Sequence, residues 1–168
     1  MADIVVREFV AGDGTGIAQI SRDNGVYYAG LDPELFRRPD DDGLVELIEN
    51  DSDWRVAPEN LALVAEVDGI VAGYLEASVQ EPLETARWQT QRDLGVRRLF
   101  INFVGTADAF KRRGVATALV EAAEAWGVSQ GATVALCDTW IDSPVSVPFW
   151  ESRMGYARRG IILRKALG

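Results

Sequence analysis

Lys111-Arg112-Arg113-Gly114-Val115-Ala116-Thr117 is the stretch that decides the fold, because it joins two strongly patterned segments. The segment before it, 98–104, is a nearly continuous apolar run and predicts a strand covered on both faces. The segment after it, 114–129, repeats apolar residues at helical spacing and predicts an amphipathic helix. The first N–H groups of a helix lack internal acceptors and carry the positive end of its dipole, so this basic turn predicts a phosphate site. Solvated surface charge is the competing interpretation of the three cations.

Outward from this unit, predicted strands and helices alternate, which indicates a mixed α/β sheet flanked by helices. The strongest local signal is Asp68-Gly69 between two apolar runs, which is typical of a β-hairpin over 61–67 and 70–76. The remaining predicted elements, in chain order, are a strand over 3–10, a helix from an N-cap at Asp13 to about residue 24, a mobile lid over 25–58 with a helical patch near Leu44, a polar connection over 80–93, a strand over 133–141, a short helix from Ser146 that ends at Gly155, and a strand over 156–166.

Composition narrows the functional classes. The 168 residues fit one domain, 1–168, and with 48% apolar residues the chain can bury a core. The absence of histidine excludes Ser-His-Asp and Cys-His catalysis and His-ligated zinc. The single cysteine, Cys137, forbids an internal disulfide and suits a reducing compartment, so a cytoplasmic protein without a metal is expected. A net charge of -9 disfavours nucleic acid and favours neutral or cationic partners, and no apolar run is long enough to span a membrane.

Three segments, in the right order and on the right elements, resemble the GNAT superfamily of acyl-coenzyme A-dependent N-acyltransferases. Lys111-x-x-Gly114-x-Ala116 is similar to the signature Arg/Gln-x-x-Gly-x-Gly/Ala, with lysine at the first position. The stretch 100–106 resembles the fourth strand of the family. The stretch 143–156 is similar in outline to its late segment Tyr-Glu-x-x-Gly-Phe, with Trp150 in place of the tyrosine. The order of elements also matches from residue 3 onward, so the resemblance covers nearly the whole chain.

The resemblance implies both a fold and a cofactor site. The sheet would be mixed and mostly antiparallel, with its fourth and fifth strands splayed apart, and acetyl-CoA would lie between them as the cosubstrate. Main-chain amides of the basic turn would hold the pyrophosphate, and backbone groups at the end of the fourth strand would pair with the pantetheine arm. The coenzyme A-binding residues so implied are Val104, Gly105, Thr106, Lys111, Arg112, Arg113, Gly114, Val115, Ala116, Thr117, Ser143, Ser146 and Trp150.

Candidates for the acceptor site and for catalysis rest on weaker patterns. Asn102 is polar within an apolar strand and could orient a water or the acceptor amine, and Asp138 is the comparable acid on the next strand. Glu66 and Glu76 could each serve as a base with a raised pKa in a closed pocket, although strand alternation would place such residues in solvent. The candidate acceptor-site residues are Tyr28, Glu76 and Trp140, and packing on the core is the alternative for the aromatic ones.

The activity implied by the resemblance is transfer of an acetyl group from acetyl-CoA to a primary amine of a small molecule or peptide, by direct attack. Trp150 cannot protonate the departing sulfur as a tyrosine would, but a thiol of pKa about 8.5 can leave without that help. Because of Trp150, a second alternative is a non-catalytic acyl-CoA-binding module. A third alternative is an interaction protein whose basic turn binds another phosphate ligand. The sequence does not identify the amine acceptor or the oligomeric state, and a homodimer is one of the alternatives.

Overall fold

The structure is a computed structural model, and it describes residues 3–167. The chain divides into two compact units, Met1–Asp138 and Thr139–Gly168. None of the helices in this described part of the chain is both long enough and apolar enough to cross a membrane.

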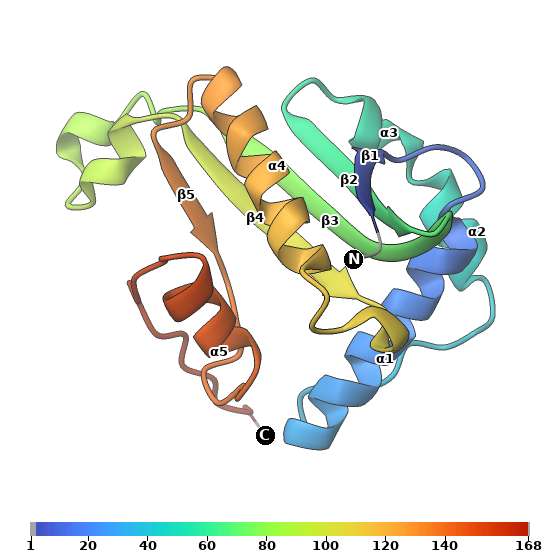
Figure 1. The fold of residues 1–168 in the computed structure, drawn as a ribbon. Helices are drawn as coiled ribbons and strands as arrows, with labels where there is room; N and C mark the ends of the chain where they lie inside the picture. Colours follow the sequence, from blue (N-terminus) through green and yellow to red (C-terminus); the bar gives the residue numbers. More distant parts are fainter. Residues whose placement is uncertain (1–2, 168) are drawn as a thin grey trace. The chain divides into compact units, whose positions relative to one another are not determined.

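The first unit is built on one five-stranded sheet (Figure 1). Its strands, in spatial order, are β1 (Ile4–Glu8), β2 (Asn60–Val67), β3 (Ile70–Gln80), β4 (Arg98–Thr106) and β5 (Val134–Cys137). The pairings from β1 to β4 are antiparallel, and β4 pairs with β5 in parallel. The predicted mixed, mostly antiparallel sheet is therefore confirmed.

β4 and β5 separate along their length, as the predicted splay requires. Their register begins at Arg98 opposite Val134 and reaches only to Ile101 opposite Cys137, while β4 itself continues to Thr106. The strand predicted over 133–141 is consequently too long. It ends where its hydrogen-bonding partner diverges, because a strand at a sheet edge lasts only as long as its ladder.

The hairpin predicted at Asp68-Gly69 is present between β2 and β3. Both turn residues have positive φ, 53° and 75°, as a two-residue turn matched to the twist of the strands requires. The second strand is longer than the sequence pattern indicated, since β3 runs on to Gln80.

Two helices cover opposite faces of the sheet, α1 (Gly14–Leu31) and α4 (Val115–Ser129) (Figure 1). Neighbouring residues of β3 show this arrangement, because successive side chains of a strand point to opposite faces. Gly73 lies against α4, where a Cβ atom would come within 2.4 Å of Val115 Cγ1. Tyr74 packs in the cluster that includes Ile17 and Ile20 of α1. The helix predicted over 114–129 is confirmed.

The segment predicted as a lid, 25–58, is mostly helical. Residues 25–31 continue α1, which ends just before Pro33 because a residue that precedes proline is driven out of the helical region. Two short helices follow, α2 (Leu44–Asn50), which confirms the helical patch near Leu44, and α3 (Ser52–Val56). The predicted end of the first helix near residue 24 was therefore too early.

Asp13 precedes α1 as predicted, but its side chain does not cap the helix. Its two carboxylate oxygens accept hydrogen bonds from the Arg7 guanidinium, each 2.7 Å long, and one also accepts from the Val10 N–H at 2.8 Å. Arg7 contacts Glu66 of β2 as well, at 2.5 Å. This network joins β1, β2 and the start of α1, and it explains why the carboxylate is not available to the helix.

The second unit contains α5 (Ser146–Pro148), which continues into a π-helical turn, Phe149–Arg153. The predicted short helix is therefore present, with Pro148 in its first turn. A π turn holds one more residue than an α turn. Three residues separate Glu151 from Gly155 where the resembled pattern has two, so this segment matches the pattern only in outline.

Residues 156–166 do not form the predicted closing strand. The described residues 156–167 take part in none of the five-stranded ladder, and Ile162 and Leu163 are 85% and 90% exposed. An apolar, β-branched run satisfies the pattern for a strand, but a strand also needs a partner for its backbone groups, which the pattern alone does not supply.

Candidate functional site

The basic turn that precedes α4 has an unusual backbone. A 3₁₀ turn, Asp108–Phe110, leads out of β4, and Arg112 and Gly114 then adopt positive φ, 63° and 91°. Gly114 is the residue from which α4 begins, and a non-glycine residue would be strained there. A Cβ atom at this position would meet only Ile4 Cδ1, at 3.8 Å, so the space above the turn is open.

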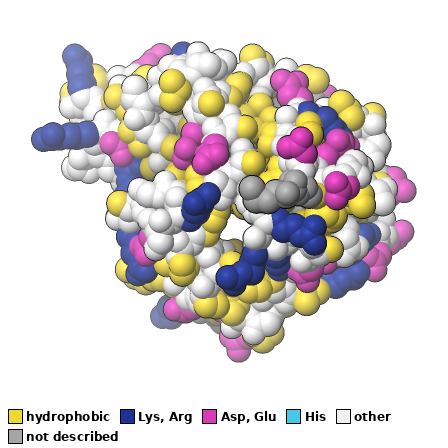
Figure 2. Space-filling model, viewed as in Figure 1, with side chains coloured by type: hydrophobic (Ala, Val, Ile, Leu, Met, Phe, Trp, Pro, Cys, Tyr) yellow, Lys and Arg dark blue, Asp and Glu magenta, His cyan; other side chains and the backbone are white. Residues whose placement is uncertain are grey.

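This open space lies over the start of a helix. The first bond of the helical ladder runs from the Ala118 N–H to the Gly114 carbonyl, at 3.0 Å, so the N–H groups of Val115 and Ala116 lie ahead of the ladder. Lys111, Arg112 and Arg113 are all exposed. Figure 2 shows Lys and Arg side chains over the region where α4 begins in Figure 1. The turn therefore has the amides, the positive charge and the room that a phosphate requires.

Lys111 is directed toward α1. Its ammonium pairs with the Asp108 carboxylate and lies 5.4 Å from the centroid of the Tyr27 ring. Asp23 of α1 in turn accepts the Asp108 N–H at 2.8 Å. The residue at the first position of the signature thus contributes to anchoring the turn on α1, and the exposed guanidinium groups of Arg112 and Arg113 complete its positive charge.

The second half of β4 borders the separation of the strands. Val104, Gly105 and Thr106 pair with β3 on one side and lie beyond the last pair between β4 and β5, Ile101 with Cys137. Gly105 is pressed against α1, since a Cβ atom would come within 2.6 Å of Ile20 Cγ2. The three residues and the basic turn are consecutive along the chain, so the structure brings these two predicted parts of the coenzyme A site together.

Asn102 lies at a β-bulge. Glu76 of β3 is opposite Phe103, and Ala77 is opposite Ile101, so Asn102 is the extra residue on β4. Its side chain is exposed, and its Oδ1 accepts a hydrogen bond from the Ser78 hydroxyl at 3.1 Å. The bulge coincides with the point at which β5 stops pairing with β4.

Glu76 faces the same side of β3 as Tyr74 and Ser78. The Tyr74 hydroxyl donates to Glu76 Oε1 at 2.7 Å, and the carboxylate is half-buried. Burial, assisted by the charge of Asp51, raises the pKa of Glu76, against the opposing effects of Tyr74 and Arg55. Burial and the neighbouring carboxylate also hold the pKa of Tyr74 far above its ordinary value. The alternative that strand alternation leaves Glu76 in solvent is therefore wrong.

Glu66, the other acidic candidate on a strand, forms an ion pair with Arg7. Nε and Nη2 of Arg7 both donate to Glu66 Oε1, at 3.0 and 2.5 Å. Because Arg7 also holds Asp13, the group belongs to the structural network at the start of α1. A carboxylate held in this way is a poor candidate for a base that must take up a proton.

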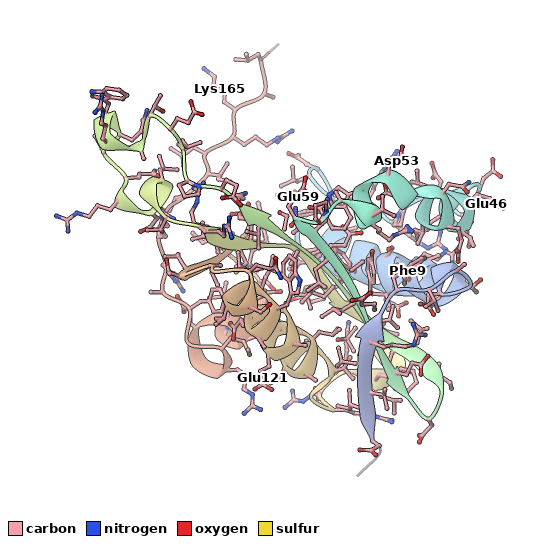
Figure 3. The ribbon with its side chains drawn as sticks, turned by 90° about the horizontal axis from the view of Figure 1, so that it is seen from above. Phe9, Glu46, Asp53, Glu59, Glu121 and Lys165 are labelled. Carbon is pink, nitrogen blue, oxygen red and sulfur yellow. The ribbon has the colours of Figure 1, made fainter. Side chains whose placement is uncertain are left out.

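Arg55 of α3 is a site residue that the sequence reasoning missed. Its guanidinium carbon lies 3.9 Å above the Phe9 ring, its Nη1 is 3.5 Å from the Glu49 carbonyl, and its buried Nε has no hydrogen-bond partner among the described residues. The positive charge of Arg55 opposes the rise in the pKa of Tyr74. Figure 3 shows Phe9 where the chain leaves β1 toward α1. A single cation within an acidic segment was the signal available in the sequence.

The remaining predicted residues lie elsewhere. Tyr28, inside α1, packs on Tyr27 and Phe36 with ring centroids 5.0 and 5.1 Å apart, so the packing alternative is present. Asp138 is exposed and follows β5, outside the strand on which it was predicted. Burial, with a contribution from Asp138, raises the pKa of the Cys137 thiol to about 12.

Trp140, Ser143, Ser146 and Trp150 belong to the second unit. Trp140 does not end the strand as predicted, because β5 stops at Cys137. Ser143 is buried, and its hydroxyl accepts the Ser146 N–H at 3.0 Å. Trp150 is only 6% exposed and lies edge-to-face between Phe149 and Tyr156, at 5.0 and 4.9 Å.

Comparisons with known proteins agree with this geometry. The sequence pattern of the acetyltransferase (GNAT) family matches residues 27–156. Comparison with curated proteins finds no match. Among solved structures, a transcriptional regulator from Bacillus halodurans C-125 is similar over 98% of this chain and 100% of its own, with 19% identity and a TM-score of 0.74.

Two aminoglycoside acetyltransferases are also similar in fold. The aminoglycoside N-acetyltransferase AAC(6')-Iy in complex with CoA matches over 99% of this chain and 97% of its own, with 20% identity and a TM-score of 0.64. The enzyme meta-AAC0020, from an uncultured soil metagenomic sample and in complex with sisomicin, matches over 98% and 97%, with 14% identity and a TM-score of 0.63. At these identities the similarity establishes the fold.

Proposed function

Because the chain belongs to the acetyltransferase (GNAT) family, we propose that it transfers an acetyl group from acetyl-CoA to a primary amine of a small molecule or peptide. The observation that carries this proposal is the path along the chain from the part of β4 beyond its last pair with β5 to the open turn at Gly114. One end of the path is suited to a phosphate, and the other is the part of β4 that lies beyond its last pair with β5.

The residues of this path fit coenzyme A. The N–H groups of Val115 and Ala116, with the exposed cations of Arg112 and Arg113, would hold the pyrophosphate. The β4 backbone over 104–106 would pair with the amides of the pantetheine arm, as an additional strand pairs with a sheet edge. The open space at Gly114, where a Cβ atom has only one neighbour at 3.8 Å, supports this fit.

Acetyl-CoA would supply an activated acetyl thioester, and the chain would supply positioning and electrostatics. A backbone N–H near Val104 would donate to the acyl oxygen, because that part of β4 lies beyond its last pair with β5. Asn102 Oδ1 accepts from Ser78 and has a second lone pair, with which it would accept a hydrogen bond from the acceptor amine or a water. Holding both reactants in one geometry provides much of the rate enhancement in a direct transfer.

The charge around the acceptor side supports an amine substrate. The segment 46–59 carries Glu46, Glu49, Asp51, Asp53 and Glu59 against one cation, Arg55. Figure 3 shows Glu46, Asp53 and Glu59 on the α2–α3 side of the sheet. A locally negative surface attracts cationic ligands. The aminoglycoside acceptors of two similar structures, AAC(6')-Iy and meta-AAC0020, fit this expectation.

A second candidate is a non-catalytic acyl-CoA-binding module. Trp150 favours it, because this buried side chain has no hydroxyl with which to protonate the departing sulfur. The two candidates share the coenzyme A site and differ only in turnover.

Two measurements on the wild-type protein test the proposal. Acetyl-CoA is expected to raise the melting temperature, because a ligand that binds only the folded state stabilises it. Thiol release is then measured with a panel of monoamines, polyamines, aminoglycosides, amino acids and peptides. Release that depends on an amine supports the transferase, stabilisation without release on any amine supports the binding module, and the absence of stabilisation contradicts both.

A further inference from the structure

A cluster of polar side chains on the α1 face of β3 has an arrangement that the coenzyme A site does not use. Tyr74, Glu76 and Ser78 alternate along β3 on one face, and Arg55 reaches this face from α3. Beside them, Asn102 marks the bulge of β4 and accepts the Ser78 hydroxyl at 3.1 Å. The cluster therefore adjoins the point at which β4 and β5 separate.

The two oxygens of Glu76 have different surroundings. Tyr74, itself only 3% exposed, donates its hydroxyl to Oε1 at 2.7 Å. Within residues 3–167 the structure gives Oε2 no hydrogen-bond donor. The carboxylate is half-buried, so Oε2 is held in a fixed direction and can still accept a hydrogen bond from a ligand.

Arg55, on α3, also acts on Tyr74 and Glu76 through its charge. Its guanidinium is fixed over the Phe9 ring at 3.9 Å. Tyr74 thus donates to the Glu76 carboxylate in the field of a nearby cation, and its proton is directed to Oε1 of Glu76. A hydrogen bond of this kind orients the carboxylate that accepts it, and a neighbouring charge polarises it.

We infer that Tyr74 and Arg55 are positioning residues that hold Glu76 as the group that takes a proton from the acceptor amine. The inference rests on the proposed function. The acceptor ammonium passes one proton to Oε2 of Glu76, and its nitrogen lone pair then forms the bond to the acyl carbon. The carbon–sulfur bond breaks with its electron pair going to sulfur, and the second nitrogen proton leaves to solvent.

Glu76 is suited to this task because it is half-buried. The titratable and charged groups that act on it are the neutral Tyr74 hydroxyl on its own strand, Arg55 of α3, and Asp51 between α2 and α3. Burial and Asp51 raise the pKa of Glu76, whereas the Tyr74 hydrogen bond and the Arg55 charge lower it. A base with a pKa brought closer to neutrality is a more effective proton acceptor, provided that it stays ionised at the working pH.

Tyr74 and Asp51 shift the pKa of Glu76 in opposite directions. This gives a test that a merely structural role would not pass. In the wild-type protein and three full-length variants, kcat/KM for the best amine is measured against pH. Glu76→Gln is expected to lower kcat/KM about 100-fold or more, with the Kd for acetyl-CoA within about twofold of wild type. Tyr74→Phe removes a donor to the carboxylate and is expected to move the acidic limb of the profile upward by about one unit. Asp51→Asn removes a negative neighbour and is expected to move that limb downward.

A measurement without turnover accompanies the profiles. Carboxyl ¹³C NMR titration, with Glu76→Gln used to assign the resonance, is expected to show the Glu76 pKa above its ordinary value of about 4.3, higher in Tyr74→Phe and lower in Asp51→Asn. Turnover unaffected by Glu76→Gln overturns this inference alone. The inference is also overturned if the acidic limb of the pH profile moves in the same direction in Tyr74→Phe and Asp51→Asn, or if Glu76 titrates at its ordinary value. Absence of amine-dependent release in the wild type overturns the proposed function as well.

Discussion

Gly73 of β3 is the position at which a single methyl group should disturb both the fold and the cosubstrate turn. An added Cβ would lie 2.4 Å from Val115 Cγ1, 2.9 Å from Leu119 Cδ1 and 3.2 Å from the Gly105 carbonyl. Ordinary contacts of this kind are about 3.5–4 Å, so Gly73→Ala must push the first turn of α4 away from the sheet by roughly 1 Å. Val115 and Leu119 are fully buried and have no free space to move into.

Overpacking of a core by one methyl group costs about 1–3 kcal/mol. For a protein of this size that corresponds to a melting temperature lower by about 2–12 °C. Because Val115 is the first residue of α4, we also expect weaker binding of acetyl-CoA at a temperature where the variant is folded. Thermal unfolding and isothermal titration calorimetry measure the two effects.

Gly30→Ala is the matched control for Gly73→Ala. Gly30 lies near the end of α1, and an added Cβ there has no neighbour within 4 Å. Alanine is favoured over glycine in a helix by up to about 1 kcal/mol, so this variant should be as stable as wild type or slightly more stable. A Gly73→Ala variant with the melting temperature and acetyl-CoA affinity of wild type would refute the close packing of α4 on β3.

Two further predictions concern groups outside the cosubstrate site. Asp13→Ala should lower the free energy of unfolding by about 1–3 kcal/mol, because it leaves Arg7 with one carboxylate partner in place of two. Burial raises the pKa of Asp13, but the hydrogen bonds from Arg7 and Val10 outweigh it and lower the pKa overall. The contribution of Asp13 is therefore present above the unfolded pKa of about 3.9 and is lost as the pH falls below it. Urea unfolding at pH 7 and pH 3 should show the difference between wild type and Asp13→Ala shrink, and a constant difference would contradict the role of the ion pair. Cys137, whose thiol pKa burial raises to about 12, should react with a thiol reagent at pH 8 far more slowly in the folded than in the unfolded protein. Equal rates would show that the thiol is not shielded.

The elements that the sequence predicted well are those that local chemistry specifies. Asp68-Gly69 needs only its own two residues to form the hairpin turn, and the apolar spacing over 114–129 is sufficient for α4. The basic turn could be located because strand, turn and helix are consecutive. Its first N–H groups take their direction from α4 itself, so no distant contact had to be known.

The features that the sequence did not predict depend on residues far apart in the chain. Strand β5 ends at Cys137 because β4 diverges from it, and 156–166 is not a strand although its apolar run fits one. Asp13 has the residue type of an N-cap, but Arg7 engages its carboxylate. Alternation along β3 would leave Glu76 in solvent, whereas the side chain is half-buried. That Arg55 from α3 would complete its surroundings follows only from the folded chain.

The measurement that most directly tests the cosubstrate site is acetyl-CoA binding by Gly114→Glu, compared with Gly43→Glu. Both glycines precede a helix with positive φ, 91° and 71°, and both have open space around the Cβ position, so the backbone strain is matched. Only Gly114 lies in the basic turn. By isothermal titration calorimetry we expect Gly43→Glu to bind acetyl-CoA as wild type does, and Gly114→Glu to show no binding, because its carboxylate would lie where the phosphates bind. Wild-type affinity in a folded Gly114→Glu would contradict the placement of coenzyme A at the start of α4.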